Sequence, residues 1–118
     1  KNKIVICDRF VDSTIAYQVH GKKVKLNFIN DIHKIILGNL KPDITFVLKV
    51  SPKSSRKRLL KRRSKNRYDK FPQSFYNKVQ KSFIKLSKNK KNYHIFDSSK
   101  NDKSLEDLIL KSTLKYLE

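Results

Sequence analysis

The chain has 118 residues, enough for one domain with a modest hydrophobic core and too few for two. Its single cysteine, Cys7, excludes an internal disulfide and a multi-cysteine zinc site, and we expect it to be a small buried residue. The apolar run at residues 4–7 is too short for a signal-peptide core or a membrane span, so we expect a soluble, cytoplasmic protein. The chain begins at Lys1 and contains no methionine, which favours a piece of a longer protein.

The net charge of +19 is the strongest compositional signal. Clustered Lys and Arg side chains release counterions from nucleic acid, so such a charge can indicate a polyanionic partner. Here lysines occur in every segment and the aromatic residues fall mostly on apolar faces, which favours a compositional bias over a nucleic-acid interface. Residues 53–70 are the exception, because they hold ten basic residues and a single acid, Asp69.

The first predicted element is a buried strand over residues 3–7, a short β-branched run of the kind found in parallel sheets. A helical turn follows, capped by Asp12 or Ser13 and continuing through Gln18. The glycine and lysines at residues 21–23 are expected to break it.

An amphipathic helix is predicted next, over about residues 26–40, and Pro42 is expected to end it. Its apolar arc is wide, which is typical of a helix that packs on both a sheet and a partner subunit. A second buried strand is predicted over residues 44–48.

A helix opened by Ser51-Pro52 then leads into the basic stretch, followed by a loop at residues 66–71. A further helix at about residues 73–88 and a third strand at residues 93–96 come next. Residues 104–107 resemble a capping box at the start of the last helix. Strands that alternate with helices predict an α/β fold with a parallel sheet.

An acid and a base, Asp8 and Arg9, directly follow the first predicted strand. In open α/β sheets, ligands bind at the carboxyl ends of strands, so these side chains are candidates for a phosphate site. The planar guanidinium of Arg9 can grip a phosphate, and Asp8 can orient it or hold a magnesium-bound water. Taken alone, such a pair is more often a salt bridge, and a basic loop is more often a solvated face.

Four motifs, in this order and at family-like spacing, resemble those of thymidylate kinases: Asp8-Arg9-Phe10; Ser13-Thr14 with Ala16-Tyr17-Gln18; Pro42-Asp43-Ile44-Thr45 at a strand start; and Asn66-Arg67-Tyr68-Asp69. The resemblance covers essentially the whole chain, as the C-terminal half or more of the family's sequence. It implies an α/β, P-loop-kinase-like three-layer sandwich with a parallel sheet that is incomplete at its N-terminus. Residues 1–118 would form the C-terminal part of a single nucleoside monophosphate kinase domain, with a lid over about residues 58–72.

This resemblance implies transfer of the γ-phosphate of ATP to dTMP, giving dTDP, with Mg²⁺ as cofactor. The implied partners are dTMP, ATP and a second copy of the chain, with neither a membrane nor nucleic acid. The helix predicted over residues 26–40 is the candidate for part of the homodimer interface.

The resemblance also assigns the site residues. Arg9 would bind the dTMP phosphate, with Asp8 beside it as a catalytic residue, near the sugar and linked to the metal through water. The other residues of the dTMP site would be Ser13, Thr14, Tyr17 and Gln18. Among these, Thr14 would hydrogen-bond the thymine edge, and Tyr17 would lie under the deoxyribose and exclude a 2′-hydroxyl.

On the ATP side, Arg62 and Arg67 fall where bacterial-type lids carry their catalytic and adenine-covering arginines. Arg58, on the same helix, is assigned to ATP as well. Asp97 and Ser98 correspond to the loop that cradles the adenine ring.

The chain departs from the family at several places. Lys49 stands where the family has an aspartate at a strand end, and Asn66 replaces the lid aspartate, with Asp69 in place of the lid glutamate. His20 is expected to be a surface residue. The 118 residues hold two glycines, Gly21 and Gly38, and no Gly-x-x-x-x-Gly-Lys-Ser/Thr loop, so the P-loop is expected to precede Lys1 and the isolated chain to be inactive.

Two alternatives remain open. One is another deoxynucleotide or deoxynucleoside kinase with the same fold. The other, from a different class, is a small basic nucleic-acid-binding protein, which predicts tight, salt-dependent DNA binding by this chain alone.

Overall fold

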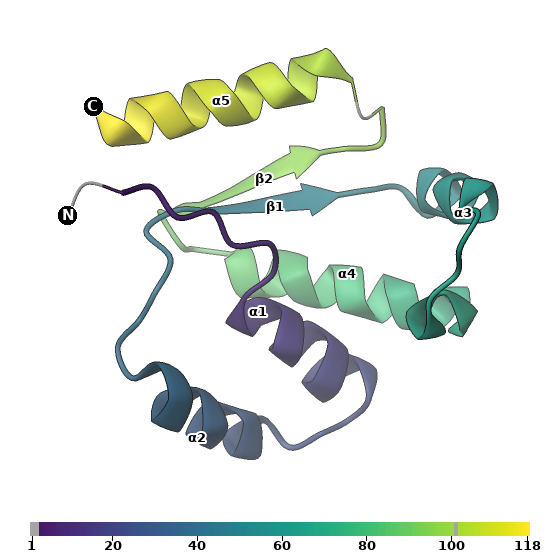
Figure 1. The fold of residues 1–118 in the computed structure, drawn as a ribbon. Helices are drawn as coiled ribbons and strands as arrows, with labels where there is room; N and C mark the ends of the chain where they lie inside the picture. Colours follow the sequence, from purple (N-terminus) through teal and green to yellow (C-terminus); the bar gives the residue numbers. More distant parts are fainter. Residues whose placement is uncertain (1–2, 101) are drawn as a thin grey trace.

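The computed structural model describes residues 3–100 and 102–118. Its elements, in chain order, are α1 (Val11–Thr14), the π-helix η1 (Ile15–Gly21), α2 (Leu26–Leu37), β1 (Thr45–Lys49), α3 (Pro52–Lys61), the 3₁₀ turn η2 (Arg67–Lys70), α4 (Gln73–Ser87), β2 (Tyr93–Asp97) and α5 (Lys103–Leu117). In Figure 1, α5 lies on one side of the two strands and α4 on the other. Within the described ranges, no helix is long and apolar enough to cross a membrane.

The strands β1 and β2 form a parallel pair, as the sequence predicted. Thr45 lies opposite Tyr93 and Lys49 opposite Asp97, so both strands end at the same edge. A parallel pair needs a long crossover connection, and the segment that holds α3 and α4 supplies it. The loops that follow the two strands are therefore neighbours.

The prediction of a strand over residues 3–7 is wrong. This segment has no regular structure, and Ile4, Val5 and Ile6 are 66%, 85% and 92% exposed. Cys7, predicted to be buried, is exposed, and its thiol donates a hydrogen bond to the carbonyl oxygen of Arg9 at 3.2 Å. A strand is stable only when a neighbour pairs with its backbone groups. In the described part of the chain, β1 pairs with β2 and neither strand pairs with this segment.

The helix boundaries confirm some capping predictions and correct others. Ser51 caps α3, since its hydroxyl accepts the Ser54 N–H at 3.2 Å. The helix predicted over about residues 26–40 ends earlier, at Leu37, and Gly38, which follows with a φ of 56°, takes the place of Pro42 as the residue that ends it. Positive φ favours glycine, which has no Cβ to clash.

Two other predicted caps are wrong. The cap position of α1 is Phe10, which makes no side-chain cap hydrogen bond, so neither Asp12 nor Ser13 caps this helix. The cap of α5 is Asp102, whose carboxylate accepts the Ser104 N–H at 3.2 Å, two residues before the predicted position.

The hydrophobic core lies between η1 and α4. Ala16 is fully buried, and Phe75 and Val79 are 8% and 4% exposed. Partly buried rings surround them, namely those of Tyr17, Phe71, Tyr76 and Phe83. The segment that carries the predicted dTMP residues is thus held by α4, which comes about sixty residues later in the chain.

The π-helix η1 packs closely against α4. The N–H of Lys22 donates to the carbonyl oxygen of Tyr17, five residues earlier, at 3.0 Å. At Gly21 a Cβ would lie 2.7 Å from Cε2 of Phe75 and 3.4 Å from the carbonyl oxygen of Ala16. The Phe75 ring stacks on Phe71 with centroids 4.4 Å apart, which limits its freedom to move away. Glycine at position 21 therefore permits the close approach of the two helices.

A partly buried hydrogen bond joins α1 to β2. The phenol of Tyr93 donates to Oδ2 of Asp12 at 2.6 Å. Burial, and then the hydrogen bond and charge of Asp12, raise the pKa of Tyr93 to about 12. This bond fixes the start of the helical segment to the sheet.

We expect Gly21→Ala to destabilise the protein by about 1–3 kcal/mol, because the added methyl group overpacks a core in which the Phe75 ring cannot shift freely. Urea unfolding measures the loss. The control is the same substitution in a Phe75→Leu background, where the smaller side chain relieves the clash. The clash is contradicted if the two substitutions add without a coupling of at least about 0.5 kcal/mol.

We expect Tyr93→Phe to lower the free energy of unfolding at neutral pH by about 1–2 kcal/mol, because Asp12 loses its donor. The folded pKa of Tyr93 is raised, so its contribution is complete below pH 10 and is lost as the pH rises to about 12. The difference between wild type and variant should therefore shrink over that range. Tyr116→Phe, at an exposed tyrosine of α5, is the matched control. A pH-independent difference would contradict this account.

Candidate active site

The predicted phosphate-binding arginine sits beside the predicted sugar-binding tyrosine. The guanidinium carbon of Arg9 lies 5.1 Å from the ring centroid of Tyr17, within the range of a cation–π contact. Arg9 has a φ of 67°, a left-handed conformation that costs a residue with a side chain roughly 1–2 kcal/mol. Strained backbone of this kind clusters at functional sites. Asp8 and Arg9 are both exposed and lie in a bend, not at the end of a strand.

The aromatic ring of Tyr17 is held from its other side by α4. It makes edge-on contacts with Phe75 and Phe83, at centroid distances of 6.0 and 6.4 Å. Edge-on pairs of this kind contribute about 0.5–1.5 kcal/mol beyond the burial of apolar area. Tyr17 thus packs against the hydrophobic core and also contacts Arg9.

The remaining predicted dTMP residues follow one another along the same helical segment. Ser13 and Thr14 end α1, and Gln18 lies in η1. All three are half-buried, and Thr14 and Gln18 are about one turn apart. The structure therefore brings together the predicted acceptor residues on one short, continuous piece of helix next to Arg9.

A second group of predicted residues gathers at the carboxyl ends of the strands. The guanidinium of Arg58 donates to the carbonyl oxygen of Ser98, and to that of Ser99 at 3.1 Å. The hydroxyl of Ser98 donates to the carbonyl oxygen of Lys49 at 3.0 Å. The loop predicted to cradle adenine is thereby tied both to α3 and to the end of β1.

Within this loop, Asp97 accepts a hydrogen bond from the Ser99 N–H at 2.8 Å. The hydrogen bonds from Ser99 lower the pKa of the Asp97 carboxyl group, which is fully exposed. Asp97 therefore presents a stable negative charge at the sheet edge.

The lid arginines occupy different environments. Nη1 of Arg62 lies 3.2 Å from Oδ1 of Asp69, and the two side chains are 57% and 7% exposed. Asp69 also accepts the Asn66 N–H at 2.7 Å. Arg67 opens η2 and is exposed. In place of the loop predicted at residues 66–71, the segment contains a short 3₁₀ turn that Asp69 and Asn66 stabilise.

Sequence reasoning missed several residues that build these groups. Asp12 was considered only as a helix cap, and nothing in its spacing indicated Tyr93, 81 residues away. The same holds for Gln80, whose Oε1 accepts the Val50 N–H at 2.7 Å and ties α4 to the end of β1. His20 is exposed as expected, but its Nδ1 shares a hydrogen bond with the buried hydroxyl of Ser82.

No group of three or more His, Cys, Asp or Glu side chains that could hold a metal ion occurs in residues 3–100 and 102–118. The water-mediated contact of Asp8 with Mg²⁺ stays a prediction.

The sequence model of the thymidylate kinase family matches residues 1–109. A thymidylate kinase of Wolbachia pipientis wMel is 47% identical over 87 residues, which cover 74% of this chain and 42% of the relative. Thymidylate kinases of Mycoplasmopsis pulmonis and Mycoplasma capricolum subsp. capricolum are 36% identical over 115 and 121 residues. These two matches cover 94% and 100% of the chain, and 49% and 57% of the relatives. The chain thus spans about half the length of the curated relatives it matches. It belongs to the thymidylate kinase family.

Proposed function

We propose that this chain supplies the dTMP-binding residues and the arginine lid of an enzyme that transfers the γ-phosphate of ATP to dTMP, giving dTDP. The observation that carries the proposal is the strained Arg9 held over the ring of Tyr17, in a chain of the thymidylate kinase family. The family match supports neither another deoxynucleotide kinase nor a nucleic-acid-binding protein.

The acceptor residues suit a nucleoside monophosphate. The exposed guanidinium of Arg9 presents a planar pair of donors to a phosphate. Tyr17, immobilised by Phe75 and Phe83, forms a rigid wall on which the sugar lies and against which a 2′-hydroxyl would collide. Thr14 and Gln18, about one turn apart, present a hydroxyl and an amide to the edge of the base.

Ser13 completes the acceptor side. Its N–H donates to the carbonyl oxygen of Phe10 at 2.9 Å, in the turn that leads from Arg9 into α1. We propose that Ser13 acts on dTMP through this turn, by holding the backbone that aims Arg9.

The donor residues suit the phosphates and adenine of ATP. We propose that Arg62 exchanges Asp69 for the phosphates of ATP when the lid over residues 58–72 closes, since its guanidinium is already half in solvent. Arg67 would follow on η2 and cover the adenine. Arg58 holds the loop that contains Asp97 and Ser98, so it would shape the adenine site from behind. Positioned arginines stabilise the charge that shifts during phosphoryl transfer.

Asp8 fits an indirect role toward Mg²⁺. Magnesium keeps several waters and binds proteins through one or two carboxylates together with substrate phosphates, and Asp8 is an exposed carboxylate next to Arg9. When bound with ATP, the ion neutralises charge on the phosphates. Asp8 would hold a metal-bound water and orient Arg9.

We further propose that the full-length protein completes a three-layer sandwich and forms a homodimer. Helix α2 buries Ile29 but leaves Phe28, Ile35 and Ile36 59%, 83% and 72% exposed, which suits a subunit interface. The family's phosphate-cradling glycine-rich loop has no counterpart among these 118 residues.

A panel of acceptors tests the proposed reaction in the full-length protein. With ATP and Mg²⁺, we expect dTDP from dTMP at a kcat/KM well above those for dUMP, dCMP and thymidine, and little turnover of the ribonucleotide analogue of dTMP. Product formation is followed by ion-exchange chromatography. Faster turnover of thymidine or dCMP would instead identify another deoxynucleoside or deoxynucleotide kinase.

We expect Arg9→Gly to weaken dTMP binding by about 10- to 100-fold, as for a lost charge-assisted hydrogen bond. Because glycine adopts positive φ freely, the same change should leave the free energy of unfolding within about 1 kcal/mol of wild type. Calorimetric titration and urea unfolding give the two readouts. Arg9→Lys, which keeps the charge but not the planar fork, should give an intermediate affinity. Unchanged dTMP affinity in Arg9→Gly would sink the assignment.

A further inference from the structure

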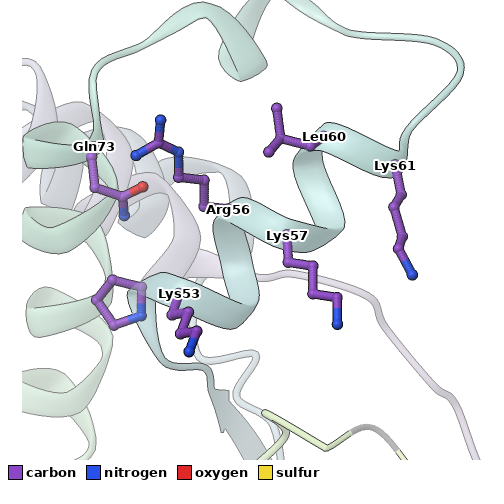
Figure 2. Close-up of a pocket in the computed structure, with 7 residues that line it drawn as sticks. Lys53, Arg56, Lys57, Leu60, Lys61 and Gln73 are labelled. Carbon is purple, nitrogen blue, oxygen red and sulfur yellow. The ribbon is translucent and has the colours of Figure 1, made fainter.

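Helix α3 carries cations on more than one side. Arg58, on one face of α3, contacts the loop after β2, and Arg62, the residue that follows α3, contacts Asp69. Lys53, Lys57 and Lys61 are spaced by four residues and project together from another side of the helix (Figure 2). The proposed kinase chemistry uses the first face and leaves the second without a role.

The second face, which we call the outer face of α3, borders an open cavity of about 600 Å³. Its polar lining residues are Lys53, Arg56, Lys57, Lys61 and Gln73, and Pro52 and Leu60 complete the lining. Figure 2 shows Gln73, from the first turn of α4, beside Arg56. None of the residues that line this cavity is acidic.

This concentration of charge works against the helix that carries it. Like charges four residues apart on a helix repel, as in the pairs Lys53–Lys57 and Lys57–Lys61. Cations in the first turn also oppose the helix dipole, and α3 begins at Pro52 with no acid in its ten residues. A bound anion would reduce both the repulsion between the lysines and their unfavourable interaction with the helix dipole. The outer face is therefore poised to bind negative charge.

We propose that the outer face of α3 binds a linear chain of phosphate groups. The three lysines are spread over about 12 Å along the helix, in steps of about 6 Å, so they match charges in a row better than one compact anion. Among the described residues that line the cavity there is no aromatic ring on which a base could stack, so we propose that binding does not involve base recognition. Inorganic polyphosphate and the backbone of a single-stranded nucleic acid both offer this chemistry.

The test measures binding of long-chain inorganic polyphosphate and of oligothymidylate to the full-length protein by fluorescence anisotropy and calorimetry. If four cations take part, affinity should fall ~50-fold between 50 and 200 mM salt. In the variant Lys53→Gln/Lys57→Gln/Lys61→Gln, that salt effect should drop to ~3-fold, and affinity at 50 mM salt should fall at least about tenfold.

The matched control is Lys78→Gln/Lys81→Gln/Lys85→Gln, which removes the same charge from exposed positions of α4, and it should change affinity by less than about twofold. Lys57→Glu alone, at the centre of the stripe, should also abolish most binding. Glutamine is a good helix former, so circular dichroism should show both triple variants folded.

Three results would overturn the proposal: absence of binding, an equal loss in the two triple variants, or full displacement of polyphosphate by ATP. Displacement would place the phosphate chain at Arg58 and Arg62 and not on the outer face. Tighter binding of polyphosphate than of oligothymidylate, compared per phosphate, assigns the inorganic chain, and the reverse order assigns the nucleic-acid backbone. The kinase assay and the binding assay are separate measurements. A failure of the proposed kinase reaction can therefore be told apart from a failure of phosphate-chain binding.

Discussion

The close packing of the π-helix on α4 holds the helical segment that carries Tyr17 and Gln18, two residues of the candidate site. Ala16 and Phe75 meet at the centre of this contact, and Gly21 lets the two helices approach. The same contact sets the ring of Tyr17, which in turn lies against Arg9. A core of this kind transmits small changes in shape, since interiors are close-packed and relax little. The position of Tyr17 in the candidate site therefore depends on the packing of η1 against α4.

The residues at the carboxyl ends of the two strands are held together by polar contacts, not by apolar packing. Arg58 bridges α3 to the carbonyl groups of Ser98 and Ser99, and Ser98 reaches back to Lys49. Hydrogen bonds from a charged donor are stronger than neutral ones, yet each can break without opening a core. This difference would suit the proposed kinase site, in which the dTMP side needs a rigid wall and the lid must move.

The cations in and next to α3 lie in two different environments. Arg62 is matched by Asp69, an acid that is almost fully buried, whereas the lysines of the outer face have no acidic residue in their cavity. The charge of Arg62 is thus locally balanced. The outer face keeps its charge unbalanced, which favours an external anion.

The sequence by itself determined the family, the parallel strand pair and most helix positions, because these depend on local motifs and on apolar periodicity. The site residues that it indicates stay predictions. It did not determine which apolar runs become buried. Ile4 to Cys7 has the composition of a core strand, but it is exposed because pairing requires a neighbour that composition cannot reveal. Only the tertiary structure joined Asp12 to Tyr93, Gln80 to Val50 and Arg62 to Asp69. Such contacts arise when separate elements fold together, and their partners carry no signal in local spacing.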